Sequence, residues 1–347
     1  MTNAIEAHEL RKTFGGEVRA LDGVSFAVEE GTIFGLLGPN GAGKTTAVRI
    51  LTTILSPDSG TGLVLGYDVV TQAERVRTLI GLAGQYAAVD ENLTGRENLT
   101  MVGRLNHMER DAVVRRAVEL LDEFDLTDAG DRPLKTYSGG MRRRLDVAAA
   151  LVARPKVLFL DEPTTGLDPQ SRADVWAMID HLVIEGTSVL LTTQYLEEAD
   201  LLAHQIAVVD HGRVIAEGTP TRLKADLGAT VLDVGLADAE VARQAAGILD
   251  GVGAKSPTVI GTVVELPVDN GPKVAMEVLR LLDQHALVPT TFRIREPSLD
   301  DVFLALTGKR AEGEDDGSST TTATDGQRRG RRRTPAVAAT TNDGGAR

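Results

Sequence analysis

Four short, largely apolar runs are spaced along the first two thirds of the chain, at residues 33–37, 157–160, 188–191 and 206–209. A run without alternation is typical of a strand buried on both faces, because such a strand has no solvent-facing side. A turn and then apolar residues at helical spacing follow each run. The pattern predicts an α/β fold with a largely parallel core sheet, ending near residue 226.

Two other patterns lie within this region. Residues 5–10 and 24–28 alternate more loosely between apolar and polar positions, which favours antiparallel strands that flank the core sheet. Residues 96–124 instead predict two helices. We therefore assign residues 1–226 to one domain, with a helical insert at about residues 90–150.

A second unit follows the break at Gly218-Thr219-Pro220. Its elements are expected in the order strand, helix, two strands, helix, strand, which is the order of a ferredoxin-like domain. A last helix begins after Ser298, which we expect to be its N-cap. The sequence thus predicts a small α+β domain at residues 227–308.

The segment from residue 309 to 347 contains no Leu, Ile, Met or aromatic residue. It cannot bury enough apolar surface to offset the entropy of ordering, so we predict a disordered tail. A basic cluster at residues 328–333 interrupts it. We interpret this cluster as solvated, with contact to anionic lipid or nucleic acid as the alternative.

Composition narrows the possible functions. The chain has 37 Lys and Arg against 50 Asp and Glu, a net charge of −13, and 3% aromatic residues, which argues against nucleic acid as a partner. It has no cysteine, so disulfides, thiol chemistry and cysteine-ligated zinc are excluded. The N-terminus lacks the features of a signal peptide, and the longest apolar run, residues 147–153, is too short to cross a bilayer. We expect a cytoplasmic chain that needs a separate partner for any work at a membrane.

Residues 38–45 read Gly-Pro-Asn-Gly-Ala-Gly-Lys-Thr and satisfy the P-loop pattern GxxxxGK[ST]. They lie between a predicted strand and a predicted helix, as that motif requires. Glycines allow backbone N–H groups to surround phosphates, Lys44 can reach the β- and γ-phosphates, and Thr45 can bind Mg²⁺. The alternative is a chance glycine turn, but the context favours nucleotide binding.

Two acidic residues, Asp161 and Glu162, end the strand predicted at residues 157–160. Beside a P-loop, an aspartate in this place can hold Mg²⁺, and the adjacent glutamate can polarise an attacking water.

Ser138-Gly139-Gly140 opens another predicted helix. That helix end is shaped for a second phosphate contact, although an ordinary serine N-cap is the preferred explanation when the motif is taken alone.

These motifs, in this order, resemble the nucleotide-binding subunit of ATP-binding-cassette (ABC) transporters over roughly residues 4–226. The resemblance implies a P-loop NTPase fold of the ABC type that uses ATP and Mg²⁺. It also implies that Gln85 is the Q-loop residue, that residues 137–141 form the signature, that residues 166–169 form the D-loop, and that Gln194 occupies the switch position. It implies the following site residues: for nucleotide binding Phe14 (stacked on adenine), Gly38, Pro39, Asn40, Gly41, Ala42, Gly43, Lys44, Thr45, Thr46, Gln85, Ser138, Gly139, Gly140, Met141 and Asp168; for metal binding Thr45, Gln85 and Asp161; and for catalysis Lys44, Glu162 and Gln194.

The chain departs from the family pattern at several positions. Tyr137 and Met141 flank the signature where the family commonly has Leu and Gln, and Gln194 replaces the usual switch histidine. Neither signature change removes the N–H groups or the hydroxyl that would meet a phosphate. The segment at residues 295–306 and the Thr-Thr-Gln switch resemble the daunorubicin-resistance type of drug-export ATPase.

By this resemblance the chain is the ATP-hydrolysing motor of an exporter for a drug or other hydrophobic compound. Two copies would face each other head to tail, each ATP held between the P-loop of one copy and Ser138-Gly139-Gly140 of the other. A separate transmembrane permease would hold the pair at the cytoplasmic side of the membrane. The alternatives are an ABC importer ATPase and a soluble ABC ATPase without a transport role. A single P-loop, and only 53 residues between Gln85 and Ser138, argue against the soluble class.

Overall fold

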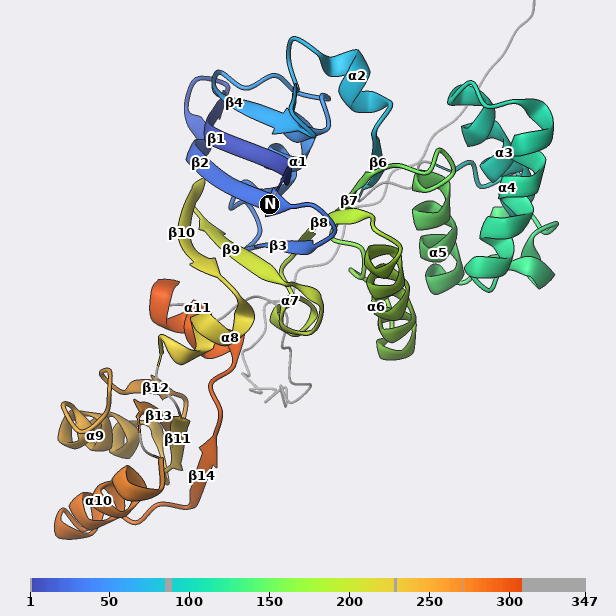
Figure 1. Cartoon of the computed structure of the whole chain (residues 1–347). Coiled ribbons are helices and arrows are strands. Elements are labelled where there is room, and N and C mark those ends of the chain that lie inside the picture. The colour runs from blue at the N-terminus through green and yellow to red at the C-terminus, as the bar shows by residue number, and fades with distance from the viewer. Residues whose placement is uncertain (1, 85–88, 228–229, 270, 308–347) are drawn as a thin grey trace, which may run out of the picture. The chain divides into compact units, whose positions relative to one another are not determined.

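The central element of the chain is a six-stranded sheet (Figure 1). The computed structural model describes residues 2–84, 89–227, 230–269 and 271–307. The strand order is β10-β9-β3-β8-β7-β6, and all neighbours are parallel except the edge pair β9 and β10. This confirms the predicted α/β fold class. The strands are β3 (Ile33–Leu37), β6 (Ile80–Ala83), β7 (Val157–Asp161), β8 (Ser188–Thr193), β9 (Gln205–Asp210) and β10 (Arg213–Gly218).

Successive residues of each core strand pack into different clusters. In β7, Leu158 and Leu160 face a cluster built with α4, α5 and α6, whereas Val157 and Phe159 face a cluster built with α1 and the N-terminal strands. Both faces are therefore apolar, which is why these strands show no alternation. The helices of this part are α1 (Lys44–Leu51), α2 (Ala73–Arg77), α6 (Pro169–Ile184), α7 (Leu196–Leu202) and α8 (Pro220–Ala225).

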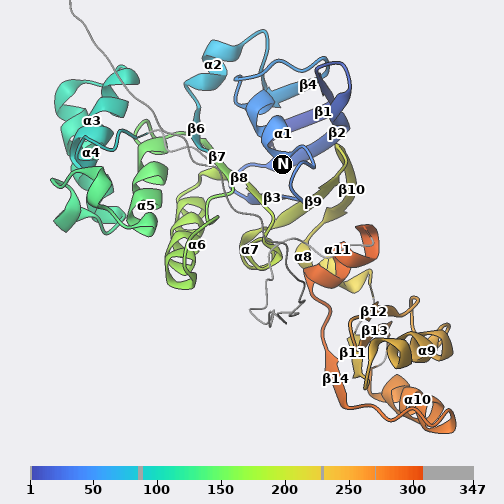
Figure 2. The ribbon, with the colours of Figure 1, turned by 180° about the vertical axis from the view of Figure 1, so that it is seen from behind.

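A second, antiparallel sheet of order β2-β1-β4-β5 is built largely from the N-terminal strands. Both views show α1 between this sheet and the central one (Figures 1 and 2). The packing places the first turn of α1, and the loop before it, at the carboxyl end of β3. The strands are β1 (Asn3–Phe14), β2 (Val18–Glu29), β4 (Ser59–Val64) and β5 (Tyr67–Asp68).

The predicted helical insert consists of helices and short 3₁₀ turns. Its apolar side chains, such as Leu99 and Leu121, share one cluster with α5 and α6. The signature helix α5 thereby connects the insert to the central sheet. The elements before the signature helix are α3 (Gly95–Leu105), α4 (Arg110–Glu123), η1 (Thr127–Ala129) and η2 (Leu134–Thr136), and the signature helix itself is α5 (Gly139–Ala150).

The C-terminal part has its own four-stranded antiparallel sheet, of order β12-β13-β11-β14. Side chains such as Leu232, Val234 and Leu266 pack against two helices on one face. With two helices between its strands in the order β-α-β-β-α-β, this sheet has the arrangement of a ferredoxin-like unit. The boundary at residue 226 stays a prediction, and the tail at 309–347 lies outside the described residues. The elements are β11 (Thr230–Gly235), α9 (Ala239–Leu249), β12 (Thr258–Ile260), β13 (Val263–Val268), α10 (Gly271–Gln284) and β14 (Thr291–Arg295).

The last helix, α11 (Leu299–Thr307), packs on the first part of the chain. Its apolar residues Leu299, Val302 and Phe303 share a cluster with residues of α7, α8 and β9. The hydroxyl of Ser298 accepts a hydrogen bond from the N–H of Asp301, as expected of an N-cap. The helix is thus anchored outside the small sheet that precedes it.

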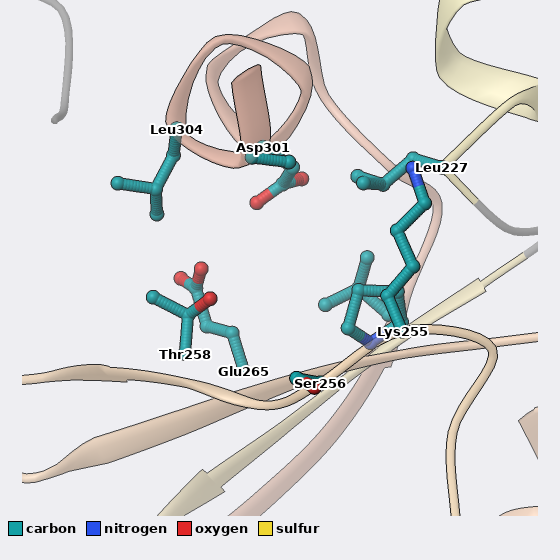
Figure 3. Close-up of a pocket in the computed structure, with 10 residues that line it drawn as sticks. Leu227, Lys255, Ser256, Thr258, Glu265, Asp301 and Leu304 are labelled. Carbon is teal, nitrogen blue, oxygen red and sulfur yellow. The ribbon is translucent and has the colours of Figure 1, made fainter. Parts of the chain in front are cut away.

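Arg295 ties α11 back to that sheet. Its guanidinium pairs with Asp301 of α11, with Asp233 of β11 and with Glu265 of β13. Burial opposes ionisation of Asp301, but the Arg295 guanidinium and the N–H of Ser298 outweigh it, so the pKa of Asp301 lies below its usual value. A cavity of about 310 Å³ lies beside this cluster, and the carboxylates of Glu265 and Asp301 point toward it (Figure 3).

Candidate active site

The P-loop joins the end of β3 to the start of α1. Gly41 and Gly43 have φ angles of +80° and +111°, in the left-handed region that favours glycine. A Cβ at Gly43 would overlap the carbonyl oxygen of Ala20, and one at Gly38 would overlap that of Val209. The loop can therefore run this close to its neighbours only with glycine. Pro39, Asn40 and Ala42 lie in the same loop, and Thr46 lies in the first turn of α1.

Lys44 is the first residue of α1 and is 4% exposed. Its ammonium donates to the carbonyl oxygens of Gly38 at 2.6 Å and Pro39 at 3.1 Å. It also lies 3.6 Å from Oε1 of Glu162. The positive charge is thus held over the loop, where a phosphate bound by the loop's N–H groups would meet it.

Asp161 ends β7 and is 4% exposed. Its Oδ1 accepts hydrogen bonds from the hydroxyl of Thr45 at 3.2 Å and from that of Thr192 at 2.5 Å. A carboxylate and a hydroxyl held together, next to a phosphate loop, are oxygen donors of the kind Mg²⁺ takes with water and phosphate. The donor set therefore fits Mg²⁺, although the described residues contain no group of three or more His, Cys, Asp or Glu arranged to hold a metal.

Glu162 has a φ of +50°, a left-handed conformation that costs a non-glycine residue about 1–2 kcal/mol. Its N–H donates to both the carbonyl and the hydroxyl oxygen of Thr192, each at 3.1 Å, and its carboxylate accepts from Thr165 at 3.3 Å. These contacts hold the carboxylate beside Lys44. The strained turn thus places an acid next to the P-loop.

Gln194 directly follows β8, on the same edge of the sheet as Asp161. The side chain is half-buried, and its Oε1 is fully enclosed without a hydrogen-bond partner among the described residues. A buried acceptor without a donor is costly. This oxygen is therefore placed to accept a hydrogen bond from a water or ligand at the sheet edge.

The signature begins α5. Ser138 is its N-cap and accepts from the N–H of Met141 at 3.2 Å, while Ser138 and Gly139 are exposed. A Cβ at Gly140 would overlap the hydroxyl of Ser171. Asp168 caps α6 by accepting from the N–H and hydroxyl of this same Ser171, at 3.0 and 2.7 Å. The structure thus brings the signature and the D-loop side by side.

Phe14 and Gln85 complete the predicted set. Phe14 is 43% exposed at the end of β1, so it is not a core residue, and the ammonium of Lys12 lies 6.0 Å from its ring centroid. Gln85 lies outside the described residues. Its neighbour Gly84 is described, and the carbonyl oxygen of Gly84 accepts from Arg143 at 2.8 Å.

Two buried side chains near the site did not appear in the predicted set. Arg143 of α5 contacts the backbone on both sides of Glu162. Glu198 of α7 is fully buried and accepts from Thr164 and Trp176, both at 2.9 Å, and burial raises its pKa. One signal in the sequence could have found Arg143. Asp146 stands one helical turn later in an otherwise apolar segment, and a buried acid needs a partner.

Comparison with known proteins gives two family matches, one for each part of the chain. The ABC transporter family matches residues 21–165, and "ATP-binding protein DrrA1-3-like, C-terminal domain" matches residues 218–307.

Individual relatives match over most of their length. The chain is 54% identical to the daunorubicin resistance ATP-binding protein DrrA2 of Streptomyces coeruleorubidus, over 89% of this chain and 96% of that protein. It is 51% identical to the daunorubicin/doxorubicin resistance ATP-binding protein DrrA of Streptomyces peucetius, over 90% of this chain and 94% of that protein. Among solved structures, cbiO1 of Clostridium perfringens, part of the ABC transporter complex cbiONQ, has a TM-score of 0.60 at 26% identity, over 65% of this chain and 92% of that one. The resemblance drawn from the motifs is confirmed, and the chain belongs to the ABC transporter family of ATP-binding proteins, in the group with a DrrA-like C-terminal domain.

Proposed function

We propose that this chain is the ATP-hydrolysing motor subunit of a drug exporter and acts through a separate membrane subunit. The observation that carries the proposal is the meeting of Lys44, Glu162 and the Thr45–Asp161 pair at one edge of the central sheet. A P-loop that only bound nucleotide would not need an acid beside the lysine. The names of the relatives, which describe resistance to daunorubicin and doxorubicin, support the cargo class.

Each residue of the site has a role in this proposal. The P-loop N–H groups and Lys44 would bind the phosphates, Phe14 would stack on adenine, and Thr45, Asp161 and Gln85 would hold Mg²⁺. When bound, Mg²⁺ neutralises charge on the transferred phosphoryl group. Glu162 orients the attacking water and accepts its proton, while Gln194 hydrogen-bonds water or the γ-phosphate.

We further propose that the working form is a head-to-tail dimer. Ser138 and Gly139 are exposed at a helix N-terminus, which suits binding of a γ-phosphate held by the P-loop of a second copy. The D-loop residue Asp168, next to this surface, would lie in the same interface. Only the γ-phosphate would touch both copies, so ATP favours the closed pair by its differential affinity, and hydrolysis reopens it.

Mixing two inactive variants tests the dimer. A Lys44→Ala chain paired with a Ser138→Arg chain has one site with both defects and one site with neither. Such mixed dimers should recover up to about half the ATP turnover of a wild-type dimer, since one of two sites is intact, and less than half where the two sites are coupled. ATP turnover and dimer content are measured together. Mixed dimers that form but stay inactive would contradict the arrangement.

In the part of the chain that the structure describes, no helix is both long and apolar enough to span a bilayer. We propose that a permease subunit binds the dimer and holds it at the cytoplasmic face of the membrane.

Vesicles test the direction and cargo of transport. Inside-out vesicles that contain this chain and its permease should accumulate daunorubicin when ATP is supplied. Vesicles with the permease alone are the control. Uptake by right-side-out vesicles loaded with ATP would indicate an importer instead, and ATP turnover without daunorubicin movement in either orientation would reject the drug as cargo.

A further inference from the structure

Arg143 lies in the first turns of the signature helix, yet its side chain points away from solvent. The side chain is 12% exposed, and burial lowers its pKa, because a charged guanidinium loses hydration there. Nη1 donates to the carboxylate of Asp146 at 3.0 Å, and that carboxylate is itself 2% exposed. A charge buried this deeply needs fixed partners, so the position of the guanidinium is strongly determined.

Two other nitrogens of Arg143 face the backbone around Glu162. Nε donates to the carbonyl oxygen of Pro163 at 2.7 Å, and Nη2 lies 3.5 Å from that of Asp161. These two carbonyl groups are on either side of Glu162. One rigid fork therefore holds both ends of the turn in which Glu162 has its left-handed backbone.

The same guanidinium reaches a third segment. Nη1 donates to the carbonyl oxygen of Gly84 at 2.8 Å, and Gly84 directly precedes Gln85. Arg143 thus connects the signature helix, the Glu162 turn and the start of the Q-loop within one chain.

The neighbouring arginines make contacts of a different kind. Arg142 pairs with Glu91 at the surface. Arg144, with a side chain 19% exposed, donates to the carbonyl oxygen of Phe124 and pairs with Asp125 in the helical insert. The run of three arginines therefore contains one residue aimed at the catalytic turn, and Arg144 is its matched control on the same helix.

We propose that Arg143 is a positioning residue for ATP hydrolysis, which fixes the Glu162 turn and relays the position of the signature helix to it. The inference rests on the proposed function. In the dimer, the signature of one chain meets the nucleotide of the partner. When this contact moves the signature helix, Arg143 moves the Glu162 turn of the same chain. The nucleotide state of one ATP site therefore influences hydrolysis at the other.

The test replaces the guanidinium while keeping its charge. Arg143→Lys retains a cation beside Asp146, but its three donors are on one nitrogen and cannot reach Asp146 and the three separated backbone carbonyls at once. We expect the KM for ATP to change by less than about twofold, kcat per bound nucleotide to fall by about tenfold or more, and the Hill coefficient for ATP to fall. Arg143→Gln, which keeps two donors without charge, is the second variant. All variants are measured in the full chain bound to its membrane subunit.

Arg144→Lys is the control for loss of a helix contact. It should lower the melting temperature comparably and leave kcat per bound nucleotide near the wild-type value. The fluorescence of Trp176, the only tryptophan, verifies folding near the site, since its indole donates to buried Glu198. A kcat of Arg143→Lys equal to the wild-type value, or a fall matched by Arg144→Lys, would overturn the inference. Absence of ATP turnover in the wild-type complex would instead overturn the proposed function.

Discussion

Replacing Glu162 with glutamine should leave ATP binding intact and lower ATP turnover by about a hundredfold or more, the range expected when a general base is removed. Glutamine keeps the size of the side chain and its contact with Thr165, but it cannot take a proton from water. The negative charge 3.6 Å from Lys44 is also lost, which frees that ammonium to bind phosphate. An ATP-bound dimer should therefore accumulate.

Turnover, nucleotide affinity and dimer content of Glu162→Gln are measured under the same conditions. Glu197→Gln, which neutralises an exposed glutamate of α7, is the control and should behave as wild type. Near-normal turnover of Glu162→Gln would show that another group activates the water.

Replacing Lys44 with alanine should weaken ATP binding at least about tenfold, which corresponds to about 1.4 kcal/mol or more. The variant loses the charge-assisted contact with phosphate. It also loses two hydrogen bonds that close the loop on the carbonyl groups of Gly38 and Pro39. Both losses affect the same binding step.

Calorimetry measures the ATP affinity of Lys44→Ala, and thermal unfolding shows whether the loop change reaches the fold. Lys135→Ala removes an exposed lysine and is the matched control. Equal affinities of Lys44→Ala and wild type would remove Lys44 from the binding site.

Much of the fold could be predicted because its determinants are local. Strands buried on both faces leave unbroken apolar runs, so β3, β7, β8 and β9 are visible in the sequence. Boundaries shift where a cap decides them. Helix α9 begins only at Ala239, because the carboxylate of Asp238 accepts from the N–H groups of Glu240 and Val241 and acts as the N-cap.

What the sequence could not show depends on contacts between distant segments. Three consecutive arginines look alike in the sequence, and only the folded position of α5, beside the carboxyl ends of β6 and β7, gives Arg143 its backbone partners. The left-handed backbone of Glu162 is likewise invisible, since its support comes from Thr192, thirty positions away. The apolar face of α11 predicts burial, but it does not say against which helices.

The return of α11 to α7 and α8 makes the ferredoxin-like unit an insertion rather than an appendage. Both its entry, after α8, and its exit, into α11, are fastened to the ATPase core. A chain cut at residue 226 would also lose part of an apolar cluster of the ATPase core. The side chains of Leu196, Ala199 and Leu223 would no longer be covered by Leu299, Val302 and Phe303. Proteolysis within residues 236–297 should accordingly leave a nicked molecule in which α11 stays bound to the ATPase core. Deletion of everything after residue 226 should instead expose an apolar surface that promotes aggregation.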